Sequence, residues 1–250
     1  MRLTLRIHRQ AGPEAAGEWV EYDVEGLAPQ MSLLDALDLL NARLVESGDD
    51  PVSVESDCRE GICGCCGITV DGRPHGPEAN TPTCHQRLSS FDDGATVVLE
   101  PLRSGAFPVI RDLVVDRSAL DRIIAAGGFV SLDAGTAPDA DAVPTTHDVA
   151  EAALDMAACI GCGACVAACP NGAAHLFAGS KLAHLALLPH GALERTARAS
   201  AVSARLDAEF GHCSLYGACA QVCPAGIPLT AVAAVPKQRL LSLFRRRPAG

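Results

Sequence analysis

Hydrophobic and polar positions alternate at the start of the chain. Leu3, Leu5 and Ile7 are separated by polar or charged residues, as in a strand with one buried face. A second alternation covers residues 18–24, and the Gly- and Pro-containing stretch between the two predicts a hairpin connection. Further short strands are expected at 68–70 and 96–99. This part of the chain is therefore expected to form a small sheet.

A segment with the hydrophobic periodicity of a helix lies between these strands. Leucines recur at helical spacing from Leu33 to Leu44. Ser32 stands before the first of them with Asp35 three residues later, which is the order of a capping box, and Gly48 follows at the other end. The pattern predicts a helix that begins after Ser32 and ends at Gly48.

Beyond a linker bounded by prolines at 101–108, the pattern changes from strands to helices. Helices are expected at 109–126, 154–158, 174–188 and 192–210. The stretch 132–148 is rich in Asp, Ala, Pro and Thr without periodicity, and we expect a surface loop there. The fold class predicted is α+β, with one domain at 1–103 and a second, helical domain at 104–250.

The charge balance excludes one class of function. The chain has 250 residues, a net charge of −10 and no basic face, which argues against general nucleic-acid binding. It shows neither a signal peptide nor an apolar stretch of the ~18 residues that a spanning helix needs, so we expect it to be soluble by itself. Basic residues gather only between Lys237 and Arg247. This segment is either a solvated tail or a contact with a membrane partner or anionic headgroups.

Twelve cysteines change the picture, since metal binding is a better prediction for them than disulfides in a reducing cytoplasm. The first set has the C-x4-C-x2-C spacing, with a later fourth cysteine, of plant-type 2Fe–2S centres. Its expected ligands are Cys58, Cys63, Cys66 and Cys84. The spacing leaves Cys65 as a spare thiol. A structural zinc site is the alternative, although zinc ribbons usually use paired C-x2–4-C knuckles. With the strand–strand–helix order before it, this loop predicts a β-grasp ferredoxin domain.

The second set has the C-x2-C-x2-C-x3-C-P spacing of two-cluster bacterial ferredoxins. Its members are Cys159, Cys162, Cys165 and Cys169. A third set repeats this run without its middle cysteine, and comprises Cys213, Cys219 and Cys223. In such ferredoxins the fourth cysteine of each run binds the cluster of the other run. The expected ligands of a 4Fe–4S cluster are therefore Cys159, Cys162, Cys165 and Cys223.

The other site then has one ligand fewer. Its expected ligands are Cys169, Cys213 and Cys219, and Tyr216 stands where a fourth cysteine would be. Since iron–sulfur clusters are held by thiolates, the missing thiolate leaves one iron unheld and predicts a 3Fe–4S cluster. The alternative is a 4Fe–4S cluster with water or another residue at the open corner. A chain with three such centres is expected to pass single electrons along its length.

With these residues in view, the chain resembles the iron–sulfur subunit of succinate dehydrogenase and fumarate reductase, the respiratory complex II family. The resemblance rests on the segments Cys58–Gly64, Pro108–Asp116, Cys159–Pro170 and Cys213–Pro224. It implies a plant-type β-grasp ferredoxin domain followed by an all-α ferredoxin domain. It also implies a flavoprotein subunit with FAD, one or more membrane-anchor subunits, and a quinone at the anchor. Electrons would pass through 2Fe–2S, 4Fe–4S and 3Fe–4S clusters in that order, at the cytoplasmic face of a bacterial plasma membrane.

The chain departs from many relatives at the quinone end. Asn171-Gly172-Ala173-Ala174-His175 follows the first run without the tryptophan that many relatives have there. Ser214 stands where many have a histidine. The resemblance therefore implies a quinone site built differently, as in bacterial branches that use menaquinone. His175 is either a proton donor to the quinone or a polar residue at a helix start.

The function predicted is that of the electron-transfer subunit of a succinate:quinone oxidoreductase. The same ligand spacing fits a quinol:fumarate reductase, because direction depends on the potentials and on the quinone. Three further functions stay open, namely an iron–sulfur subunit of another flavin oxidoreductase, a soluble electron carrier and a zinc-stapled interaction module. The chain has no G-x-G-x-x-G motif, so flavin chemistry is expected in the partner alone.

Overall fold

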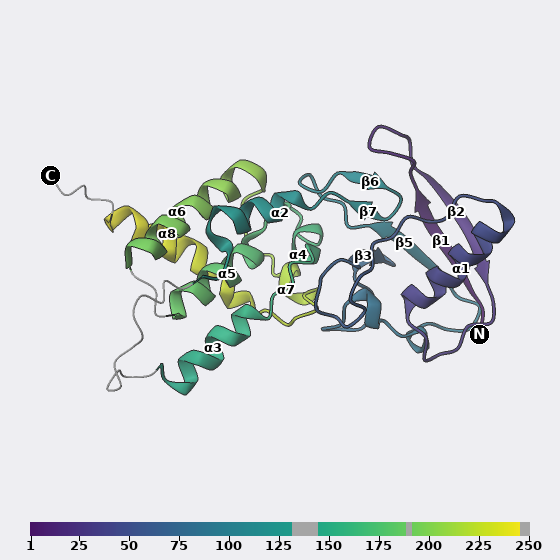
Figure 1. Cartoon of the computed structure of the whole chain (residues 1–250), viewed down its shortest axis with the longest axis horizontal. Helices are drawn as coiled ribbons and strands as arrows, with labels where there is room; N and C mark the ends of the chain where they lie inside the picture. The colour runs from purple at the N-terminus through teal and green to yellow at the C-terminus, as the bar shows by residue number, and fades with distance from the viewer. Residues whose placement is uncertain (132–144, 189–191, 246–250) are drawn as a thin grey trace.

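Five strands from the N-terminal part form one mixed sheet (Figure 1). The computed structural model describes residues 1–131, 145–188 and 192–245. The sheet has the order β2-β1-β5-β3-β4, with β1 (Leu3–Arg9), β2 (Glu18–Val24), β3 (Ile68–Val70), β4 (Arg73–Pro74) and β5 (Thr96–Pro101). β1 and β5 are parallel neighbours, and the other pairs are antiparallel. The expected strands are confirmed, and β5 runs slightly further than its pattern predicted.

Helix α1 (Leu33–Ser47) shares one core with this sheet. The Ser32 hydroxyl accepts the backbone N–H of Asp35, and the Asp35 carboxylate accepts the backbone N–H of Ser32 in return. Gly48 ends the helix in a left-handed conformation with φ 79°. Leu37 and its leucine neighbours are buried with the inward side chains of β1 and β5. The helix and both of its predicted ends are confirmed.

Residues 109–126, which the pattern predicted to be helical, are helical only in part. Val109–Arg111 (β6) and Val114–Val115 (β7) pair as a short antiparallel hairpin, and α2 (Ser118–Ile123) follows it. Asp112 turns the chain between the two strands with φ 45°, a left-handed conformation that ends any right-handed helix. The prediction was wrong over this hairpin because β-branched residues favour an extended backbone and Asp112 fixes the turn.

Asp112 also fastens the hairpin to the N-terminal sheet. Its buried carboxylate accepts Arg9 Nε at 3.0 Å and the backbone N–H groups of Gln10 and Ser53, both at 2.9 Å. The backbones join as well, since the Asp112 N–H donates to the Gln10 carbonyl and the Leu113 N–H to the Ser53 carbonyl. Charge-assisted hydrogen bonds therefore hold the segment after the linker against the sheet.

The rest of the described chain is mainly helical. Its helices are α3 (His147–Ala157), α4 (Ala164–Ala167), α5 (His175–Leu187), α6 (Ala192–Glu209), α7 (Ala218–Gln221) and α8 (Ala234–Arg245). Single turns of 3₁₀ or π helix lie at Thr83–His85, Leu88–Ser90, Ile124–Gly128 and Leu229–Ala233. α5 and α6 confirm two expected helices, and α3 is longer than expected. The fold is thus mixed α/β, with a strand-rich N-terminal part and a helical C-terminal part (Figure 1).

α5 forms the centre of the helical part, where it packs against α3, α6 and α8. Leu176, Phe177 and Leu182 of this helix are buried there. Within the described ranges, no helix is both long and apolar enough to cross a bilayer. Most of the loop expected at 132–148 and the final residues of the basic end lie outside the described residues.

Candidate metal centres

Four cysteines from two distant segments line one cavity in the helical part. Cys159, Cys162 and Cys165 come from the run that leads into α4, and Cys223 follows α7. Apolar side chains such as Phe177 form the other walls of this cavity. The structure therefore brings together the four cysteines that spacing predicted at one site.

Burial disfavours the thiolate form of three of these cysteines in the chain without metal. It raises the pKa of Cys162 to about 12 and raises the pKa values of Cys165 and Cys223, with smaller increments from neighbouring thiols. Thiols in such surroundings ionise only when a positive charge compensates them. Three buried thiols and the partly buried Cys159 around one cavity are therefore a donor set that fits a thiolate-bound iron–sulfur cluster.

A second cavity is lined by the remaining cysteines of the two runs. Cys169, Cys213 and Cys219 lie around it with Tyr216 and His175. Burial raises the pKa of Cys219, and the thiols of Cys169 and Cys213 raise it further. His175 begins α5, and its Nδ1 is buried without a hydrogen-bond partner in the described part of the chain. The structure thus gathers three thiols, a phenol and an imidazole at one site.

The two cysteine runs fold alike at their centres. Gly163 and Gly217 have φ values of 86° and 81°, and each immediately precedes a short helix. Glycine adopts this left-handed conformation without a steric penalty. Cys162-Gly163-Ala164-Cys165 corresponds to Tyr216-Gly217-Ala218-Cys219. The tyrosine therefore occupies the place that the middle cysteine occupies in the first run.

The loop between α1 and β3 carries most of the first cysteine set. Cys58 Sγ accepts the backbone N–H of Glu60 at 3.3 Å, and backbone amides, that of Glu60 first, lower the pKa of Cys58 to about 7. Cys63 lies within hydrogen-bonding reach of Cys58. Burial raises the pKa of Cys66 to about 12, and the neighbouring Cys84 thiol adds to this effect. The four cysteines thus come together as two adjoining pairs, and amides that face a sulfur favour its thiolate form.

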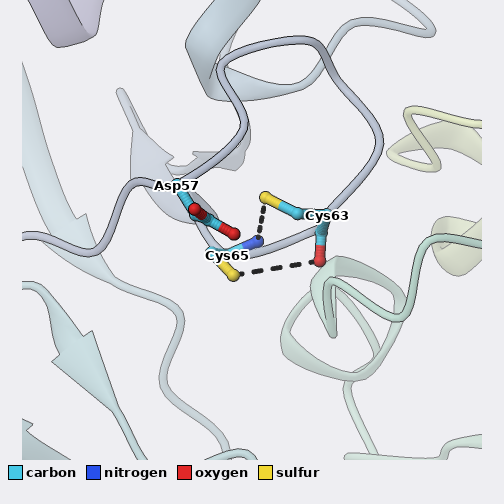
Figure 2. A group of neighbouring side chains, drawn as sticks. All are labelled: Asp57, Cys63 and Cys65. Atoms are coloured by element: carbon cyan, nitrogen blue, oxygen red, sulfur yellow. Dashed lines mark hydrogen bonds between the residues drawn. The ribbon is translucent and has the colours of Figure 1, made fainter.

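Figure 2 shows a carboxylate beside two thiols of this loop. Asp57, Cys63 and Cys65 each offer an atom within 4.8 Å of the others. The backbone N–H of Cys65 donates to Cys63 Sγ at 3.5 Å, and the Cys65 thiol donates to the Cys63 carbonyl at 3.9 Å. Cysteine spacing did not single out Asp57, and its place directly before Cys58 is the one signal in the sequence.

The loop of the first cysteine set lies directly against the run from Cys159 to Cys169. A Cβ atom on Gly64 would stand 2.4 Å from the Ile160 carbonyl oxygen and 3.0 Å from the Cys162 nitrogen. The backbone of Gly64 is also left-handed, with φ 72°. Glycine therefore allows the two backbones to approach with no side chain between them.

Comparison with known proteins agrees with this arrangement. Residues 4–122 match the family model of a 2Fe-2S iron-sulfur cluster binding domain, and residues 158–227 match that of a 4Fe-4S dicluster domain. The fold and the sites therefore define an iron–sulfur protein that transfers electrons. Two similar proteins are the succinate dehydrogenase iron-sulfur subunit of Bacillus subtilis (strain 168) and the fumarate reductase iron-sulfur subunit of Escherichia coli O157:H7. The first is 29% identical over 78% of this chain and 75% of the relative, and the second is 31% identical over 85% and 80%.

The chain belongs to the family of iron–sulfur subunits of succinate dehydrogenase and fumarate reductase, which confirms the resemblance carried by its cysteine segments. It serves electron transfer in an oxidoreductase of this kind. A chain of the Mycobacterium smegmatis Sdh1 complex in the apo form shares the fold, with a TM-score of 0.70 at 23% identity over 100% of this chain and 99% of that one.

Proposed function

We propose that the chain carries electrons in a succinate:quinone oxidoreductase through three clusters, held by eleven of its twelve cysteines. The 2Fe–2S ligands are Cys58, Cys63, Cys66 and Cys84. The 4Fe–4S ligands are Cys159, Cys162, Cys165 and Cys223. The 3Fe–4S ligands are Cys169, Cys213 and Cys219.

The observation that carries this proposal is the exchange of cysteines between the two runs. One cavity combines three cysteines of the first run with Cys223 of the second, and the other combines Cys213 and Cys219 with Cys169 of the first. This exchange is the ligand arrangement of two-cluster ferredoxins. Zinc ribbons use paired local knuckles instead, so the arrangement favours iron–sulfur clusters over a zinc staple.

Tyr216 supports a cluster with three irons at the second cavity. It takes the place of the middle cysteine, and the residue is 62% exposed. Iron in these clusters is held by thiolates, so a phenol at this place leaves one corner without a ligand.

The clusters, when bound, take up and release single electrons. The chain's own residues hold each site in place and bury five of the thiols, namely those of Cys66, Cys84, Cys162, Cys165 and Cys223. Since the loop at Gly64 lies against Ile160 and Cys162, in the run that supplies three of the proposed 4Fe–4S ligands, we propose the order 2Fe–2S, 4Fe–4S, 3Fe–4S. Electrons would enter from FAD in a flavoprotein subunit. They would leave to a quinone, proposed to be menaquinone, at a membrane-anchor subunit on the cytoplasmic face of the bacterial membrane.

The division into a β-grasp ferredoxin domain at 1–103 and an all-α ferredoxin domain at 104–250 stays a prediction. The five-stranded sheet with its parallel β1–β5 pair and the cover of α1 supports the first, and the helices around α5 support the second. The matched 2Fe-2S family model extends to residue 122.

Electron paramagnetic resonance on the assembled complex tests the cluster assignment. The oxidised protein is expected to show a 3Fe–4S signal and the reduced protein a 2Fe–2S signal. Tyr216→Cys supplies the missing thiolate, so it is expected to abolish the 3Fe–4S signal and to add about one iron per chain. Tyr216→Phe is the matched control and is expected to keep the signal. A chain purified without air that binds zinc alone, or fewer than about nine irons, contradicts the proposal.

Quinol:fumarate reductase is the second candidate, and the E. coli fumarate reductase relative supports it. Ligand geometry is the same for both directions. A redox titration of the clusters against the bound quinone distinguishes them, because succinate oxidation requires the quinone to be the better electron acceptor.

A further inference from the structure

Arg117 stands where the loops of the first and second cluster sites meet. Its Nη1 donates to the Gly64 carbonyl of the first loop and, at 3.2 Å, to the Cys162 carbonyl of the second. Its Nη2 donates to the Cys65 carbonyl at 3.5 Å and to Glu55 Oε2 at 2.9 Å. One guanidinium group therefore bridges both cluster-binding loops.

One of these hydrogen bonds continues to a proposed ligand sulfur. The Gly64 carbonyl belongs to the same peptide group as the Cys65 N–H, which donates to Cys63 Sγ at 3.5 Å (Figure 2). Successive hydrogen bonds polarise one another, so the guanidinium strengthens the bond that the sulfur accepts. Hydrogen bonds to the sulfurs and net charge are among the factors that set the reduction potential of a cluster.

The charge of Arg117 is placed to act on both loops. Its side chain is 19% exposed, whereas that of its partner Glu55 is 46% exposed, so water screens the anion more than the cation. In the second loop, the guanidinium donates directly to the carbonyl of Cys162 at 3.2 Å. Beside the first loop, burial and, to a lesser extent, the charge of Arg117 together lower the pKa of His75 to about 4. The positive charge of Arg117 therefore acts on both cluster-binding loops.

Resting on the proposed function, we propose that Arg117 is a positioning residue for electron passage between the 2Fe–2S and 4Fe–4S sites. It ties the two loops together through their carbonyls and gives both sites the same positive charge. The step moves one electron from the first site to the second, and no bond forms or breaks and no proton moves. Because each site gains negative charge on reduction, a shared cation raises both reduction potentials together and changes the difference between them little.

The test is a redox titration of the assembled complex, followed by electron paramagnetic resonance. Arg117→Gln removes the charge and is expected to weaken the one-electron reduction of both clusters about tenfold, which corresponds to about 59 mV. Arg117→Lys keeps the charge and is expected to restore most of this shift. Arg122→Gln is the matched control, since it removes an exposed cation on α2 that pairs with Glu209. We expect it to leave both potentials unchanged.

Glu55→Gln provides a second variant with the opposite sign. Removing the anion that partly neutralises Arg117 is expected to raise both reduction potentials. The equilibrium constant for one-electron reduction should change by less than tenfold, because Glu55 is the more exposed partner. The Glu55→Gln variant also tests the proposal if the Arg117→Gln complex does not assemble. An unchanged reduction potential at either cluster in Glu55→Gln then overturns the proposal. A loss of packing alone does not produce shifts of opposite sign in the two variants.

Unchanged potentials in Arg117→Gln, or a shift at only one cluster, overturn the proposal. An equal shift in Arg117→Lys and Arg117→Gln also overturns it, because the charge is then not the cause. Failure of the proposed function is distinguishable, since the wild-type complex itself would then lack the 2Fe–2S or 4Fe–4S signal.

Discussion

The substitution Asp112→Asn removes one buried negative charge and keeps the shape of the side chain. Asparagine also tolerates the left-handed backbone at this position, where φ is 45°. The variant therefore tests the carboxylate alone, without added backbone strain. If this carboxylate holds the β6–β7 hairpin against the sheet, its loss destabilises the whole chain.

The expected magnitude follows from the burial of the ion pair. The Asp112 side chain is 2% exposed and that of Arg9 is 13% exposed. Breaking such a pair by removing one partner costs about 3–5 kcal/mol. Arg9 keeps its hydrogen bonds to the Tyr22 hydroxyl and to the carbonyls of Asp50 and Pro51. Its guanidinium group is therefore not left buried without hydrogen-bond acceptors. We therefore expect the lower end, a loss of about 3 kcal/mol in the free energy of unfolding.

Thermal unfolding of the cluster-loaded chain without air, followed by circular dichroism, measures this loss. For a chain of this size, about 3 kcal/mol corresponds to a fall in melting temperature of about 6–12 °C. Glu21→Gln is the matched control, since it removes an exposed partner of Arg6 at 3.9 Å and is expected to cost less than about 1 kcal/mol. A fall for Asp112→Asn no larger than that of the control would refute the reasoning.

Two further predictions concern the first cluster loop and its surroundings. Cys66→Ser is expected to abolish the 2Fe–2S signal in electron paramagnetic resonance, whereas Cys65→Ser keeps it; the reverse result would show that the ligand assignment is wrong. Burial lowers the pKa of His75 to about 4, so as the pH falls the unfolded chain, with an imidazole pKa of about 6.5, takes up the proton first. Its contribution to stability is therefore complete above about pH 6.5 and is lost between about pH 6.5 and 4, by about 2 kcal/mol at pH 5. His75→Asn suits the left-handed backbone there (φ 70°) and is expected to remove this part of the pH dependence, measured as urea midpoints at pH 7.5 and 5. An unchanged dependence of those midpoints on pH would contradict this account of His75.

Local chemistry explains which elements were predictable from the sequence. α1 begins at a capping box and ends at a left-handed glycine, and both signals lie within a few residues of the helix. The β6–β7 hairpin carries no such signal. Its turn depends on Asp112 meeting Arg9 and Ser53, which lie far from it in the sequence. Hydrophobic periodicity does not report contacts of this kind, so the pattern predicted a helix instead.

The same distinction applies to the candidate sites. Cysteine spacing indicated which thiols gather, because a cluster fixes the spacing of its ligands along a short loop. Arg117 was not predicted, since its partners are mostly backbone carbonyls, which look alike in every sequence. Asp57 was missed for a related reason, because a single acidic residue in a loop is common. The sequence therefore indicated which thiols gather but not the charges placed around them.

The exchange of Cys169 and Cys223 between the two helical cavities has a consequence for biosynthesis. A polypeptide leaves the ribosome from its N-terminus, and its parts fold as they emerge. The first loop is complete once Cys84 has emerged, so it is ready for metal while translation continues. Both helical cavities instead need cysteines from the two runs, and the first cavity is complete only after Cys223 is made. Cofactor insertion into this protein is therefore expected to proceed in two stages, the later one awaiting the synthesis of Cys223.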